Sequence, residues 1–208
     1  MPMTSKTDII NQALAHIKQR KIASLTEVSI QASEALRCYE IARHETLRGH
    51  DWGFATVVKS LSLDSTYATD SEGTYAGKWI YAYTYPANCV AMWHIYSVGT
   101  TDKDNGEQFR VVYDDTNNKK VILTDTDEAL GEYTFDVQDV TMFDANFVSA
   151  FAYRLAADMA PNLTGDDSIA ESMFKMYTAL MQDAERVASY ESKDDSSKTA
   201  KSSYEELR

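Results

Sequence analysis

The spacing of apolar residues changes twice along this chain, and these changes limit the folds it can adopt. Apolar residues recur about every 3.6 positions in the first 50 residues, alternate with polar ones from Trp52 to Phe143, and return to helical spacing after Asp144. The first spacing is typical of a helix with one buried face, and the second of a strand with one buried face. The order of the three blocks predicts an α+β chain.

The first block predicts two neighbouring helices. The first carries a single apolar stripe and begins at Thr7 or Asp8, either of which can cap free N–H groups. The second runs from about Ser29 to Arg48, and Gly49 is well placed to end it. The stripe residues are Ile9, Ile10, Ala13, Leu14 and Ile17 in the first helix, and Ala32, Ala35, Leu36, Tyr39, Ala42 and Leu47 in the second.

The last block predicts two more helices. Asp144 is a good N-cap for the first, whose apolar residues Phe147, Phe151, Leu155 and Met159 are spaced four apart, and Pro161 is expected to end it. The second begins near Asp167 and keeps one apolar stripe to about Tyr190.

The middle block predicts a small antiparallel β unit of four to six strands. Trp79, Tyr81, Tyr83 and Tyr85 alternate with smaller residues, which favours the core face of a sheet over an exposed platform for sugars or bases. Residues 108–113 and 119–124 flank the turn-forming segment 114–118, so they predict a hairpin.

These elements predict a four-helix bundle with an inserted small antiparallel β unit and a flexible C-terminal tail. The expected segments are 1–50 for the first two helices, 51–143 for the β insertion, 144–190 for the last two helices, and 191–208 for the tail. The tail is rich in Ser, Lys, Asp and Glu, so it cannot by itself offset the entropy lost on ordering.

The charge and the cysteine content of the chain argue against several kinds of function. The net charge of −12 and the pI near 4.7 argue against a protein that grips nucleic acid through phosphates. Cys38 and Cys89 lie far apart with no neighbouring cysteine, which favours neither a disulfide framework nor a zinc site. We see no secretory signal and no apolar run long enough to span a membrane, so we expect a soluble protein of a reducing compartment.

No catalytic, cofactor-binding or metal-binding residue is predicted. His44 and His50 are six residues apart, whereas two zinc ligands on one helix face need a spacing of four. The segment from Asp102 to Gly106 begins like a calcium loop, but its glycine is one position early and Tyr113 stands where a glutamate is needed. Phosphate-binding and nucleophile-elbow motifs are absent from the sequence.

Four segments, taken in order, carry a family resemblance: RGHDWGFA (48–55), WIYAYTYPANCV (79–90), FDANFVSAFAYRLA (143–156) and LTGD (163–166). Together they resemble the tail tubular protein A family, the head-to-tail adaptors of short-tailed bacteriophages. The chain departs from the family pattern at Phe151, where leucine is usual. It also departs after the proline, where the position usually held by aspartate is displaced to Asn88.

The resemblance implies a structural protein, not an enzyme, in the tail or neck of a virion, assembled in the host cytoplasm. It implies a ring of twelve copies under the portal protein, linked to the tail nozzle protein and surrounding a channel through which genomic DNA passes without specific binding. We expect Tyr190, Tyr204 and Leu207 to anchor the chain on the portal, and the hairpin residues Lys119 and Lys120 to face the nozzle. The alternatives are a tail-associated cell-wall hydrolase and a small binding module.

Overall fold

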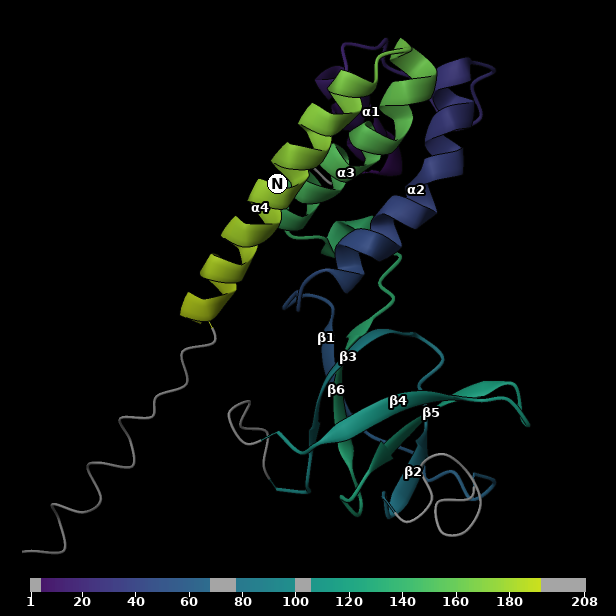
Figure 1. Ribbon diagram of the computed structural model, residues 1–208. Helices are drawn as coiled ribbons and strands as arrows, with labels where there is room; N and C mark the ends of the chain where they lie inside the picture. The colour runs from purple at the N-terminus through teal and green to yellow at the C-terminus, as the bar shows by residue number, and fades with distance from the viewer. Residues whose placement is uncertain (1–4, 68–77, 100–105, 192–208) are drawn as a thin grey trace, which may run out of the picture.

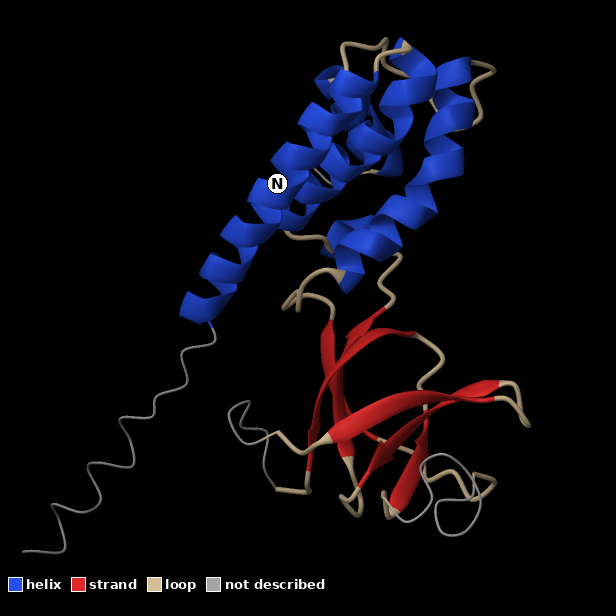
Figure 2. Ribbon diagram, viewed as in Figure 1, coloured by secondary structure: helices blue, strands red, loops and turns tan. Residues whose placement is uncertain are grey.

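The helices and the strands gather in two separate units, which we call the helical unit and the β unit (Figures 1 and 2). The computed structural model describes residues 5–67, 78–99 and 106–191. The helical unit contains α1 (Lys6–His16), α2 (Ile30–Arg48), α3 (Ala145–Thr164) and α4 (Asp167–Glu191). The β unit contains β1 (Thr56–Ser60), β2 (Tyr81–Thr84), β3 (Cys89–Tyr96), β4 (Phe109–Asp114), β5 (Lys119–Thr124) and β6 (Leu130–Phe135).

The prediction of a four-helix bundle with one small inserted β unit is wrong, because the helices pack around a central helix and the strands form two sheets. In the helical unit, α3 is a central helix, and α1, α2 and α4 each pack mainly against it. The reason lies in α3, where phenylalanine, leucine, methionine and alanine side chains are buried on every side instead of in one stripe. A helix that is apolar all round needs neighbours all round, so the other three helices surround it.

Several predicted helix details need correction. Ser5, not Thr7 or Asp8, caps α1, and Asp8 completes a reciprocal pair of hydrogen bonds with it. Pro161 lies inside α3, which continues to Thr164 and ends at Gly165 with a left-handed φ of 68°. Leu36 of the predicted α2 stripe is exposed. The stripe of the first helix is confirmed, because all five of its residues are buried.

The strands form two three-stranded antiparallel sheets. One has the order β1-β6-β3 and the other has the order β2-β5-β4. The predicted hairpin is β4–β5, in which Asp114 pairs with Lys119 and Phe109 pairs with Thr124. The strand β1 had no distinct sequence signal, yet it pairs along its whole length with β6, far away in the chain.

The two sheets meet at two edges, so together they enclose a small core. Leu63, just after β1, forms a bridge with Tyr83 of β2, and Ile95 of β3 forms a bridge with Glu107, just before β4. Between the sheets lie the buried side chains of Tyr83, Ile95 and Ile122. The Tyr83 hydroxyl donates to the carbonyl oxygen of Thr126 at 2.9 Å, so the predicted core tyrosine also fixes the β5–β6 turn.

Candidate interaction surfaces and the junction between the units

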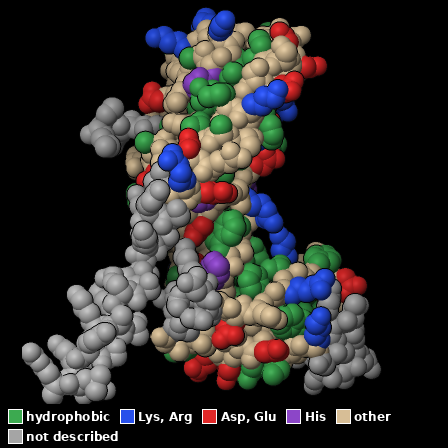
Figure 3. All heavy atoms as spheres, turned by 60° about the vertical axis from the view of Figure 1, so that its left-hand side comes forward, with side chains coloured by type: hydrophobic (Ala, Val, Ile, Leu, Met, Phe, Trp, Pro, Cys, Tyr) green, Lys and Arg blue, Asp and Glu red, His purple; other side chains and the backbone are tan. Residues whose placement is uncertain are grey.

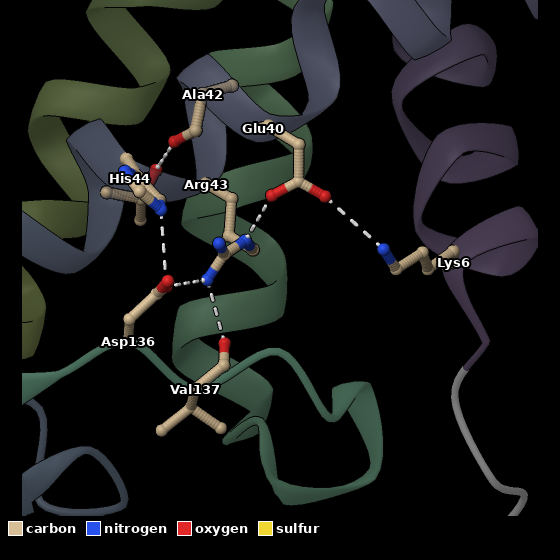
Figure 4. A network of polar contacts seen from close by, with 8 residues as sticks. Lys6, Glu40, Ala42, Arg43, His44, Asp136 and Val137 are labelled. Carbon is tan, nitrogen blue, oxygen red and sulfur yellow. Dashed lines mark hydrogen bonds and ion pairs between the residues drawn. The ribbon is translucent and has the colours of Figure 1, made fainter. Parts of the chain in front are cut away.

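Two chain segments, 49–55 and 136–144, connect the helical unit to the β unit. Beside them lies Arg43 of α2, whose side chain is only 2% exposed. Its guanidinium donates to the Asp136 carboxylate at 2.6 Å and to the Val137 carbonyl oxygen at 2.8 Å. Asp136 directly follows β6, so this cation ties the second helix to the end of the sheet (Figure 4).

The Arg43 cluster reaches further across the helical unit. The guanidinium also donates to Glu40 at 2.9 Å, and Lys6 of α1 pairs with the other oxygen of Glu40 at 3.3 Å (Figure 4). The imidazole of His44 lies 3.2 Å from the Asp136 carboxylate. The Arg43 cluster therefore connects α2 with the chain leaving the β unit, and Glu40 and Lys6 extend it to α1.

Electrostatics keep this cluster charged. Burial by itself would lower the pKa of Arg43, but hydrogen bonds to Asp136 and Glu40 outweigh burial and raise it. Burial by itself would raise the pKa of Asp136, but the neighbouring guanidinium outweighs it and lowers that pKa. A paired, hydrogen-bonded charge of this kind fixes one geometry, because leaving either partner buried alone is costly.

The structure places the two histidines weighed as metal ligands in different surroundings. His44 faces Asp136, whereas His50 packs edge-on against the Trp52 ring with centroids 4.9 Å apart. Among the described residues, no group of three or more His, Cys, Asp and Glu side chains is arranged to hold a metal ion. The calcium-like segment 102–106 lies mostly outside the described residues.

The two hairpin lysines differ in role. Lys119 lies 2.5 Å from the buried carboxylate of Asp64 and donates to the Thr66 hydroxyl at 2.6 Å, so it helps to hold the β unit together. Lys120 is exposed and lies over the Tyr85 ring, 5.2 Å from its centroid. Sequence reasoning treated the lysines as equivalent, because nothing near Lys119 in the chain indicates Asp64 as its partner.

The Asp64–Lys119 pair predicts a specific loss of stability in acid. Burial alone would raise the pKa of Asp64, but Lys119 and Thr66 outweigh it and lower the pKa to about 2. The pair therefore stabilises the fold fully above pH 4, and its contribution is lost as the pH falls towards 2. We expect Asp64→Asn to destabilise the protein at pH 6 and to match the unsubstituted chain near pH 2, measured by urea unfolding. A difference that does not change with pH would contradict this assignment.

The structure describes the side chain of none of the three residues expected to anchor the portal. Tyr204 and Leu207 lie outside the described residues. Tyr190 belongs to the last turn of α4, and only its main chain is described. The C-terminal turns of α4 extend past the other helices (Figure 1).

Two further surfaces were not predicted. A hollow of about 610 Å³ beside the start of α2 is lined in part by Leu25, Val28 and Ile30. At the end of the β unit away from the helices, the β5–β6 turn carries Asp125, Asp127 and Glu128, and Figure 3 shows acidic side chains gathered there. The sequence does not indicate either surface, because each forms only where the fold brings its residues together.

Comparison with known proteins gives no assignment. No model of a protein family matches the chain, and no curated protein matches it. In the described part of the chain, none of the helices has the length and apolar character to cross a membrane. The function is therefore argued from the geometry and from the segments named in the sequence analysis.

Proposed function

We propose that this chain is a structural head-to-tail adaptor of a short-tailed bacteriophage. In this proposal it forms a ring, of twelve copies, under the portal protein and connects the portal to the tail nozzle protein, with genomic DNA passing through the centre. The mature site of action is the neck of the virion, after assembly in the host cytoplasm. The chain carries out no catalysis in this role.

The observation that carries the proposal is the junction. An adaptor must present two different surfaces to two partners and hold them at a fixed angle. Here a helical unit and a β unit lie at opposite ends of the described part of the molecule, and the buried Arg43 cluster connects them (Figures 1 and 4). We assign the helical unit to the portal and to neighbouring copies, and the β unit to the nozzle.

The charge of the chain also supports the proposal. A net charge of −12 repels the phosphates of DNA, so a channel built from such chains lets DNA slide without holding it. The same charge makes free copies repel one another at low salt. We therefore expect the portal to trigger ring formation, with the isolated chain remaining apart from its copies.

Removal of residues 192–208 tests the portal contact. We expect the truncated chain to keep its unfolding midpoint, since the described helices and strands end at Glu191, and to lose the ability to form rings on the portal. Electron microscopy of portal mixtures measures the second effect. Full rings built by the truncated chain would refute the anchoring role of Tyr204 and Leu207.

Charge reversal at Lys120 tests the nozzle contact. Lys120→Glu changes an exposed charge on the hairpin, and we expect weaker nozzle binding with unchanged portal binding, because the hairpin belongs to the β unit. Lys119→Glu is unsuitable, because it would also break the pair with Asp64. Binding of each partner is measured separately, and an equal loss of both would contradict the assignment of the two units.

A further inference from the structure

Strand β1 has an edge that no described strand covers. The N–H of Phe135 donates to the carbonyl oxygen of Ala55 at 2.7 Å, and the N–H of Leu61 donates to that of Ala129 at 2.9 Å. In an antiparallel ladder the residues that bond to a given neighbour alternate. The odd-numbered residues of β1 therefore bond to β6, while the main-chain groups of Val58 and Ser60 point to the opposite side.

A proline explains why this edge stays open. After β1 the chain pairs with β2, since Thr84 N–H donates to the Ser62 carbonyl oxygen at 2.8 Å and Asp64 N–H donates to that of Ala82 at 2.8 Å. In the same register the next donor, opposite Ser60, would be residue 86. Pro86 has no N–H, and there the chain turns towards β3. Among the described residues, no main-chain group bonds to Val58 or Ser60 on this side.

The place where the two strands separate is a cleft of about 280 Å³. Leu61, Tyr85 and Tyr133 supply apolar walls, and Lys59 lies at its side. A cleft of this size holds a few residues of extended chain and is too small for a folded domain. The exposed side chain of Val58, 43% accessible, lies on the opposite face of the strand from Lys59 and Leu61, because successive side chains of a strand alternate between its two faces.

The cations around this cleft lack carboxylate partners among the described residues. Lys59 lies over the Phe135 ring, 5.7 Å from its centroid, and Lys120 lies over the Tyr85 ring. Arg48, whose charge acts on Tyr85, donates to the carbonyl oxygen of Val90 at 3.0 Å. These three side chains place positive charge near the cleft in a chain with 32 acidic and 20 basic residues. The local charge therefore favours an acidic ligand although the chain as a whole is acidic.

We propose that the open edge of β1 binds an extended acidic segment of a partner protein, which adds to the sheet as a strand. The main-chain groups of Val58 and Ser60 provide four hydrogen-bonding positions for two alternate residues of that segment. The residue between them lies opposite Lys59, and directly opposed side chains share one face of a sheet. The segment therefore carries Glu or Asp at that position, with an apolar neighbour opposite Val58.

The probe for this site is the peptide acetyl-Thr-Val-Glu-Val-Thr-amide, added to the full-length chain labelled with nitrogen-15. We expect its binding to shift the amide signals of Val58 and Ser60 and to slow their hydrogen exchange. A peptide with lysine in place of glutamate should bind about fivefold more weakly. A peptide methylated on both valine nitrogens should not bind, because it cannot form the ladder.

Two substitutions and a control separate the backbone and charge contributions. Lys59→Glu should reverse the preference, so that the lysine peptide binds more tightly. Val58→Pro removes an outward N–H without removing a bond to β6, and it should abolish binding. Lys175→Glu, an exposed charge on α4, should change neither result.

Three outcomes would overturn the proposal: unchanged Val58 and Ser60 signals, equal binding of the two peptides, or binding of the methylated peptide. Matching shifts with inorganic phosphate alone would also overturn it, since the cleft would then be an anion site without strand addition. The proposal does not depend on the adaptor function, because it rests on the edge of β1 and the charges beside the cleft.

Discussion

Arg43→Ala is expected to lower the free energy of unfolding by about 3 kcal/mol, because it leaves the partly buried Asp136 carboxylate without its cation. The guanidinium is buried and makes three hydrogen bonds, to Glu40, Asp136 and Val137. Its loss also removes the connection between α2 and the end of β6. Urea unfolding near pH 7 measures the change.

The control for Arg43 is Lys175→Ala on α4. Lys175 pairs with Glu171 at 2.7 Å, and the side chains of both residues are exposed. An ion pair that is exposed on both sides contributes little to stability, so Lys175→Ala should destabilise the protein far less than Arg43→Ala. Equal destabilisation would show that the junction contributes no more than a surface pair.

Phe147→Ala is expected to have the largest effect of the changes considered, lowering the free energy of unfolding by about 4 kcal/mol. Its ring is fully buried and packs against Trp52 at 5.1 Å and Phe143 at 4.7 Å between centroids. Trp52 and Phe143 belong to the two different segments that connect the units. One ring therefore holds both connections against the start of α3, and its removal leaves a cavity at that place.

The control for Phe147 is Phe174→Ala on α4. Phe174 is about half exposed, and the Arg154 guanidinium lies over its ring at 5.5 Å from the centroid. Its loss is expected to cost about 1 kcal/mol or less. If Phe147→Ala were as mild as Phe174→Ala, the aromatic cluster would not be what fixes the two connecting segments.

Local signals predicted the helices and the hairpin well. The α2 stripe, with the exception of Leu36, and the turn-forming residues from Asp114 to Asn118 specify structure through neighbours in the sequence. The predicted arrangement of the helices is wrong, because the four-residue spacing in α3 indicates one apolar face, whereas its alanines extend the buried surface around the helix. The second sheet was missed because β1 pairs with a strand about 75 residues away, and alternation alone does not indicate a partner.

The Arg43 cluster and the edge of β1 could not be predicted either, because both depend on residues far apart in the sequence. In the sequence, Arg43 belongs to an ordinary i, i+3 pair with Glu40, and only the fold brings Asp136 to its other side. The edge of β1 is also a product of the fold, since Pro86 and Ser60 become neighbours only when β2 returns beside β1. Sequence reasoning identified residues that carry charge, but it could not identify which charges would be buried together.

The most direct test of the adaptor proposal is negative-stain electron microscopy of this chain mixed with the portal protein from the same genome, beside the chain alone. The account predicts an added ring beneath the portal in the mixture and no rings in the lone sample. Portals that remain unchanged beside a compact free protein would contradict the account.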